Sequence, residues 1–104
     1  MQYTSVFFLG AGGIGMSALE RYFKQIGCYV AGYDRTPSAL TDTLIKEGIV
    51  LHFEDDPEKI PQLCRDPKTT LVVYTPAIPD DNRELQWFRQ GGFEIHKRAQ
   101  VLGT

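Results

Sequence analysis

The chain has 104 residues, enough for one compact domain and too few for a two-domain enzyme with separate cofactor and substrate lobes, so we expect residues 1–104 to form a single domain. With 42% hydrophobic residues, 23% charged residues and a net charge of -2, its composition is that of an ordinary soluble globular protein. This balance argues against a nucleic-acid partner, although backbone amides can still bind a small anion.

The cysteine count and the N-terminal segment narrow the setting. Cys28 and Cys64 lie far apart and form no Cys-x-x-Cys pair, which predicts buried, reduced thiols. The first ten residues lack a basic segment, and their apolar stretch is too short for a signal peptide or a membrane span. We therefore expect a cytoplasmic protein without a membrane partner.

The chain begins with a predicted strand, a glycine-rich turn and a helix. The apolar run at residues 5–9 ends at glycines. The helix is predicted from apolar residues at helical spacing, namely Met16, Leu19, Phe23 and Ile26.

Further strands are predicted over residues 28–33, 49–53, 70–74 and 93–96. Strands that alternate with helices need crossover connections, so we expect a Rossmann-like α/β fold: a doubly wound, parallel, five-stranded sheet with helices on both faces. Right-handed crossovers favour the strand order 3-2-1-4-5. Ligands of such sheets bind beyond the carboxyl ends of the strands.

The remaining helices have start signals in the sequence. Thr36 is expected to cap a helix that begins at Pro37. Asp56, followed by a proline, predicts a short helix, and Asn82 opens a helix that ends at a pair of glycines.

Residues 10–15, GAGGIG, match the G-x-G-x-x-G pattern and lie between the first strand and the first helix. Gly10 allows a tight turn, Gly12 lets a phosphate approach the backbone, and Gly15 lets helix and strand pack closely. Amides and dipole at the helix start then favour a diphosphate. NAD, FAD and UDP-sugars all suit such a turn, and a purely structural connection is the alternative.

Asp34 ends the second predicted strand, near the place where a dinucleotide fold sets a carboxylate against a ribose. A carboxylate accepts hydrogen bonds from a ribose diol or from an N–H group of a base. Arg35 and Thr36 add a cation and a hydroxyl, and Arg35 would suit the ribose phosphate of NADP. A solvated turn residue or a helix cap is the alternative for Asp34.

The second half of the chain narrows these alternatives. The runs VVYTPAIPDDNREL and GGFEIHKRAQVL, together with FFLGAGGIGMSALERYF, VAGYD and TDTLIKEG, resemble the Mur ligases over nearly the whole chain. The resemblance implies a domain that binds the UDP moiety of UDP-N-acetylmuramate in a ligase of peptidoglycan precursor biosynthesis, and favours the members that add L-alanine.

Carried over position by position, the family's phosphate loop falls on Gly12, Gly13, Ile14, Gly15 and Met16. Its uridine-contacting acidic corner falls on Asp34, beside Arg35 and Thr36. The turn after the fourth strand falls on Thr75, Pro76, Ala77 and Ile78, and the closing segment begins at Arg98. The chain departs from many relatives at Glu54 and Asp55, where they have Gly-His.

The resemblance also implies ATP and Mg²⁺ for the full-length ligase. No G-x-x-x-x-G-K-[ST] loop occurs in these residues, so we expect the chain alone to be inactive, to hold no cofactor and to work with the remaining domains of the same ligase. The alternatives are an NAD(P)-binding domain of an oxidoreductase, a ligand-sensing regulatory module, and a sibling ligase that attaches a peptide to the same sugar nucleotide.

Other polar residues receive structural interpretations. His52 and His96 have no acid or nucleophile nearby in the sequence, so we expect packed or solvated side chains rather than a general base. The acidic run at residues 54–56 is interpreted as a solvated turn before a capped helix rather than as a metal site.

Overall fold

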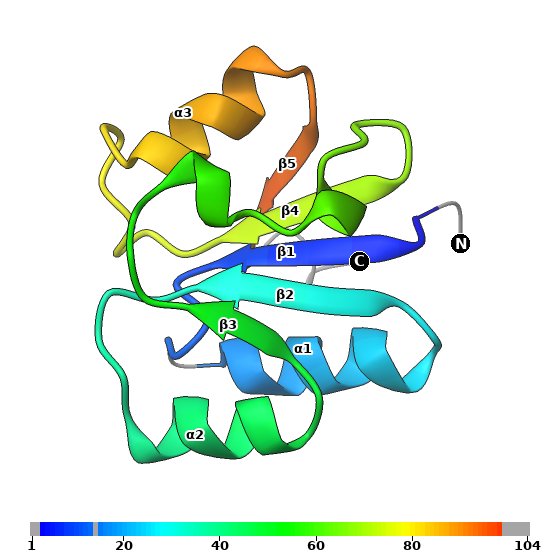
Figure 1. Cartoon of the computed structure of the whole chain (residues 1–104), viewed down its shortest axis with the longest axis vertical. Helices are drawn as coiled ribbons and strands as arrows, with labels where there is room; N and C mark the ends of the chain where they lie inside the picture. Colours follow the sequence, from blue (N-terminus) through cyan, green and yellow to red (C-terminus); the bar gives the residue numbers. More distant parts are fainter. Residues whose placement is uncertain (1–2, 14, 99–104) are drawn as a thin grey trace.

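The computed structural model describes residues 3–13 and 15–98. A five-stranded parallel sheet runs through the molecule in the order β3-β2-β1-β4-β5, and helices cover both of its faces (Figure 1). The elements are β1 (Ser5–Leu9), α1 (Met16–Gln25), β2 (Tyr29–Tyr33), α2 (Ala39–Lys46), β3 (Val50–His52), η1 (Pro57–Lys59), η2 (Gln62–Cys64), β4 (Thr70–Tyr74), α3 (Arg83–Gln90) and β5 (Glu94–Lys97). The predicted fold class and strand order are confirmed.

The central strand β1 sets the register of the sheet. Its last residue, Leu9, lies opposite Tyr33 of β2 and Tyr74 of β4. The chain therefore leaves three neighbouring strands at the same edge, which is where the predicted binding segments begin.

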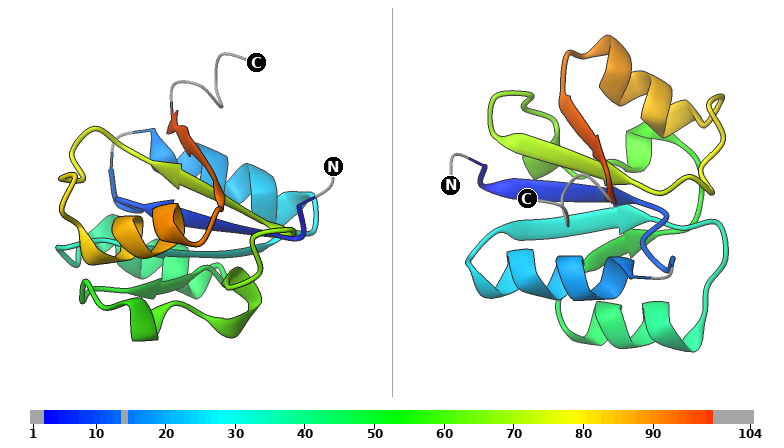
Figure 2. Two further views of the ribbon diagram at one scale, coloured as in Figure 1. Left: turned by 90° about the horizontal axis from the view of Figure 1, so that it is seen from above. Right: turned by 180° about the vertical axis from the view of Figure 1, so that it is seen from behind.

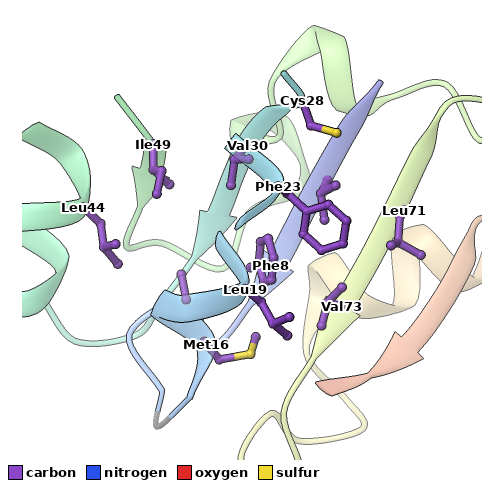
Figure 3. Packing of buried hydrophobic residues seen from close by; sticks show 12 residues of the cluster. Phe8, Met16, Leu19, Phe23, Cys28, Val30, Leu44, Ile49, Leu71 and Val73 are labelled. Atoms are coloured by element: carbon purple, nitrogen blue, oxygen red, sulfur yellow. The ribbon is translucent and has the colours of Figure 1, made fainter. Parts of the chain in front are cut away.

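Two hydrophobic clusters, one on each face, hold the helices against the sheet. Along β1, Val6 and Phe8 belong to the cluster under α1 and α2 (Figure 3), whereas Phe7 and Leu9 belong to the cluster under α3. This alternation follows from the two-residue period of a strand, and the whole of β1 is buried because helices cover both sides. In the left view of Figure 2, α1 (light blue) and α3 (orange) lie on opposite sides of β1 (dark blue).

The start of α2 differs from the prediction. Ser38, not Thr36, caps the helix: its Oγ accepts a hydrogen bond from the Thr41 amide at 3.2 Å, while Thr41 Oγ1 accepts one from the Ser38 amide at 2.7 Å. This reciprocal capping box satisfies two backbone donors, so the helix begins at Ala39 rather than at Pro37. The short helix η2 was not predicted.

Two expectations about the chain as a whole can be compared with the structure. Cys28 and Cys64 are both free and buried, as expected, and burial raises the pKa of the Cys64 thiol to about 12. In the part of the chain that the structure describes, no helix has the length and apolar character needed to cross a membrane.

Candidate functional site

A cavity of about 670 Å³ opens at the carboxyl edge of the sheet. It is bounded by the turns that follow β1, β2, β3 and β4 and by the start of α3. The predicted binding residues that line it are Gly13, Asp34, Arg35, Thr36, Thr75, Ala77 and Ile78. The cavity thus brings together three of the segments singled out in the sequence.

The other predicted binding residues lie outside the lining. Gly12 is half-buried and faces Asp34 and Thr41, Met16 is fully buried in the core, and Pro76 is exposed. Gly15 and Arg98 contact each other next to the start of α1. Ile14 lies outside the described residues.

Gly10 and Gly12 of the turn each lie close to a side chain of another segment. A Cβ on Gly10 would lie 2.8 Å from Thr75 Oγ1, and one on Gly12 would lie 2.9 Å from Asp34 Oδ2. A side chain at either glycine would force Thr75 or Asp34 to shift, because real Cβ atoms essentially never come so close to another heavy atom. The turn is therefore the meeting point of the segments after β2 and β4.

Gly15 serves a different contact from the one predicted. A Cβ on Gly15 would lie 2.9 Å from Arg98 Nη1, so the glycine makes room for this guanidinium rather than for a strand. Gly15 also has a φ of 80°, a left-handed conformation that favours glycine. Arg98, which follows β5, thus brings a positive charge to the start of α1.

Asp34 ties the glycine turn to the loop after β2. Its Oδ2 accepts a hydrogen bond from the Gly12 amide at 2.7 Å, and its Oδ1 accepts one from the Thr36 amide at 2.9 Å. Since each carboxylate oxygen has two lone pairs, both oxygens can accept another hydrogen bond from a ligand. Asp34 therefore joins the glycine turn to the loop after β2 and still has lone pairs for a ligand.

Several backbone amides near the glycine turn, where a phosphate is expected to bind, already donate to acceptors within the protein. The Gly12 amide donates to Asp34, the Gly13 amide to Gly10 O at 2.9 Å, and the Met16 amide to Gly13 O at 3.1 Å. The turn is tight enough to close on itself, which a motif in the sequence does not reveal. Any phosphate must then interact mainly with the positive end of α1.

The start of α1 differs from the starts of α2, α3 and η1, and shares its lack of a side-chain cap with the three-residue helix η2. Gly15, its N-cap, provides no side-chain hydrogen bond, and no acidic residue lies in the first turn of the helix. By contrast, Ser38 caps α2, Asp56 caps η1 and Asn82 caps α3, each through a side-chain oxygen. Among the described residues, no capping side chain and no first-turn acid therefore offsets the partial positive charge at the start of α1.

The start of α3 was missed as part of the cavity. Asp55 accepts hydrogen bonds from the Arg83 amide at 2.8 Å and from the Glu84 amide at 3.0 Å, and Asn82 caps the Leu85 amide at 2.9 Å. Asp55, Asn82 and Arg83 all line the cavity, together with Tyr33, Pro79 and Asp81. The acidic run at 54–56 is thus more than a solvated turn.

His52 has an acid partner that no local pattern indicates. Its Nε2 lies 2.7 Å from Oε2 of Glu84, a fully buried residue 32 positions further along the chain. Burial raises the pKa of Glu84, and the contacts with His52 and the Asp56 amide offset part of this rise. The histidine is packed, as expected, with its ring centroid 5.8 Å from those of Phe7 and Tyr33.

Glu20 is a second buried acid that the sequence analysis missed. Its side chain is fully buried on α1, and neither carboxylate oxygen has a hydrogen-bond partner among residues 3–13 and 15–98. Burial, followed by the nearby charge of Asp34, raises its pKa to about 8. The carboxyl is therefore neutral at pH 7. Its helical spacing among apolar residues, four after Met16, was the only available signal.

The acidic and histidine side chains do not form a metal centre in the described ranges. Within residues 3–13 and 15–98, no group of three or more His, Cys, Asp or Glu side chains could hold a metal ion. The charges at the cavity instead suit a ligand that carries both an anionic part and hydrogen-bonding groups.

Comparisons with known proteins identify the family of the chain. The model of the Mur ligase family, catalytic domain, matches residues 5–104. A UDP-N-acetylmuramate--L-alanine ligase of Phocaeicola vulgatus is 64% identical over 99 residues, which cover 95% of this chain and 22% of that protein. The chain therefore spans about a fifth of the length of the curated relatives that it matches.

Two solved structures of ligases share the fold of this chain. A UDP-N-acetylmuramate-alanine ligase, MurC, of Thermotoga maritima has a TM-score of 0.82 at 30% identity, covering 94% of this chain and 21% of that one. A UDP-N-acetylmuramate:L-alanyl-gamma-D-glutamyl-meso-diaminopimelate ligase of Neisseria meningitides, at 19% identity, shares the fold with a TM-score of 0.78 over 96% of this chain and 30% of its own. Because the family model matches nearly the whole chain, the chain belongs to the Mur ligase family.

Proposed function

We propose that this chain is the single domain that binds the UDP part of UDP-N-acetylmuramate within a longer ligase, which adds L-alanine during peptidoglycan precursor biosynthesis. The names of the relatives support the reaction, and the share of their length that the chain covers supports a domain role. The observation that carries the proposal is the helix start without a cap, placed beside a cavity at the carboxyl edge of the sheet.

The pyrophosphate binds at the start of α1. The helix dipole and the first-turn amides attract the anion there, and Arg98 adds a full positive charge beside Gly15. Gly12 and Gly13 contribute by leaving room, because their own amides are paired within the turn. Met16 has a buried side chain and an amide paired with Gly13 O, so its predicted contact with the ligand is not supported by the geometry, and Ile14 is assigned to this loop by the family resemblance alone.

The uridine binds between the loop after β2 and the turn after β4. Asp34 has lone pairs left for a base or a ribose, and Arg35 and Thr36 line the cavity beside it. The segment at residues 75–78 forms another wall: Thr75, Ala77 and Ile78 line the cavity, while Pro76 shapes the turn from outside.

ATP and Mg²⁺ are assigned to the full-length ligase and not to this chain. The described residues do not fit either group, because they hold no cluster of three metal-ligating side chains and the sequence has no phosphate loop for ATP. Activation of the substrate and attack by the amino acid then belong to the remaining domains of the same protein, which acts in the cytoplasm.

The competing functions make different predictions about the ligand. An NAD(P)-binding domain would use Asp34 or Arg35 for an adenosine ribose, and a regulatory module would bind its ligand without a ligase partner. A sibling ligase that attaches a peptide would bind the same sugar nucleotide. This last alternative shares the pocket chemistry, and the 64% identity to an L-alanine ligase argues against it.

Calorimetry on the 104-residue chain with UDP-N-acetylmuramate, UDP and NADH tests the proposal. We expect the two uridine nucleotides to bind and NADH not to bind. Gly12→Val should weaken UDP binding about tenfold, because the valine side chain would meet Asp34 and displace its carboxylate from the Gly12 amide. The control Thr43→Val adds no bulk to the cavity, since Thr43 is exposed on α2. Binding of NADH but not of UDP would refute the proposal.

A further inference from the structure

One wall of the cavity is built from two segments that are distant in the sequence. Asp55 comes from the loop after β3, and Asn82 and Arg83 come from the start of α3. Nothing in the glycine turn contacts this wall through a recorded hydrogen bond in the described residues. What holds the two segments together therefore sets the shape of this side of the cavity.

Each of the two segments supplies a carboxylate that accepts backbone amides of the other segment. Asp55 accepts the amides of Arg83 and Glu84, so the loop after β3 caps α3. Glu84 returns the contact, because its Oε2 accepts the Asp56 amide at 3.0 Å and also lies 2.7 Å from His52 Nε2. We call this set of residues, His52, Asp55, Asp56 and Glu84, the β3–α3 clamp.

The clamp is half-buried around Glu84 and is anchored to the sheet. Glu84 is fully buried, and the ring of His52 packs against Phe7 and Tyr33, the second of which also lines the cavity. Removing one partner of such a pair leaves a buried polar group unsatisfied, which costs far more than the loss of an exposed contact.

The clamp lies next to the loop that is proposed to bind the nucleoside. The Asp34 amide donates to His52 O at 3.2 Å, and Tyr33 pairs with His52 in the register of β2 and β3. The start of α1, by contrast, follows β1, which is separated from β3 by β2. A displacement of the clamp should therefore alter the nucleoside end of the cavity and spare the pyrophosphate end.

We propose that Glu84 and His52 are positioning residues that, through the β3–α3 clamp, preform the wall of the cavity next to the proposed nucleoside-binding loop. This role rests on the proposed uridine-nucleotide function. A wall that is already ordered saves the cost of ordering loops when a ligand binds, so its loss appears as weaker affinity for the nucleoside part. Neither residue needs to touch the ligand.

The test compares UDP with inorganic pyrophosphate by calorimetry at a temperature where every variant is folded. Glu84→Ala should weaken UDP binding about tenfold, because the clamp loses an acceptor for both His52 and Asp56. Pyrophosphate binding should stay within about twofold, since the start of α1 is unchanged. Glu84→Gln, which keeps an acceptor oxygen, should restore most of the UDP affinity.

His52→Phe provides a second variant in case Glu84→Ala does not fold. It keeps an aromatic ring between Phe7 and Tyr33 and removes both ring nitrogens, including the Nε2 that contacts Glu84, so UDP binding should again fall while pyrophosphate binding is kept. The matched control is His96→Phe. The Nε2 of His96 lies 3.2 Å from Glu94 on β5, outside the cavity, and this variant should bind both ligands like the parent chain.

Each outcome has a distinct meaning. If the parent chain binds UDP and both clamp variants bind it equally well, the positioning role is wrong and the proposed function stands. If UDP and pyrophosphate weaken in parallel, the clamp is merely structural and the proposal is also overturned. If the parent chain binds no uridine nucleotide, the proposed function fails and the positioning role fails with it.

Discussion

The starts of α1 and α3 both lie at the carboxyl edge of the sheet, yet side chains cap the backbone amides of α3 and not those of α1. At α3, Asp55 and Asn82 accept the amides of the first turn. At α1, no side chain caps the helix, its first turn carries no acid, and Arg98 adds positive charge. The difference teaches that the protein caps one helix start with its own side chains and leaves the other uncapped, which is what the proposed pyrophosphate site requires.

The largest effect concerns Glu20, the acid that α1 does carry on its buried face. Its pKa of about 8 in the folded chain lies above the ordinary value of 4.5, so the folded state keeps a proton that the unfolded state releases. Stability should therefore fall as the pH rises from about 4.5 to about 8. Glu20→Gln should remove this dependence and stabilise the chain by about 3 kcal/mol at pH 7.

Urea titrations of both proteins between pH 5 and pH 8 measure this difference. The comparison of helix starts requires that Glu20 be neutral, since an ionised carboxylate on α1 would offset the positive charge at its start. Parallel stability curves for the two proteins would show that Glu20 is already ionised, and would weaken the comparison.

Gly15→Asp should abolish the contrast by giving α1 its own acceptor. The new carboxylate would occupy the place of the anion and pair with Arg98, so UDP affinity should fall about a hundredfold. Gly15→Asn, which tolerates a left-handed backbone and carries no charge, is the control for the strain of losing glycine. Equal losses in the two variants would mean that space, not charge, determines binding.

Asp55→Ala should bring the start of α3 closer to that of α1, with Asn82 left as its only side-chain cap among the described residues. Because the amides of Arg83 and Glu84 lose their acceptor, the chain should be destabilised by about 1–2 kcal/mol in thermal or urea unfolding. Glu54→Ala changes the exposed neighbour and should have little effect. An unaltered stability in Asp55→Ala would show that the cap is dispensable.

The smallest effect is expected for Arg98→Gln. Its guanidinium is half-buried beside Gly15, so removing the charge should weaken UDP binding several-fold, by about 1 kcal/mol, and reduce the salt dependence of binding. Arg89→Gln, an exposed cation on α3, is the matched control. If both variants bind UDP with the same affinity and the same salt dependence as the parent chain, Arg98 has no role at the helix start.

Much of the fold follows from local signals. Apolar runs that alternate with helical spacing predicted a parallel sheet in the observed order, and the glycine pattern marked the turn after β1. The Asp34 corner and residues 75–78 were recognised because each directly follows a strand, and parallel register brings such residues to one edge.

The missing parts depend on contacts that no local pattern contains. Asp55 and Glu84 satisfy each other's segments across 28 or 29 positions, and His52 finds its acid 32 positions away. Those pairs exist only because β3 and α3 meet once the sheet has formed. The pairing of the Gly12 amide with Asp34 was missed for the same reason.

The most direct test of the central claim is a titration of the ¹⁵N-labelled chain with inorganic pyrophosphate, followed by the amide signals of the two helix starts. We predict saturable shifts for Gly15 and Ser17 at the start of α1, and unmoved signals for Arg83 and Glu84, whose amides are held by Asp55. Shifts at α3 without shifts at α1, or no saturable shift at either helix, would contradict the account.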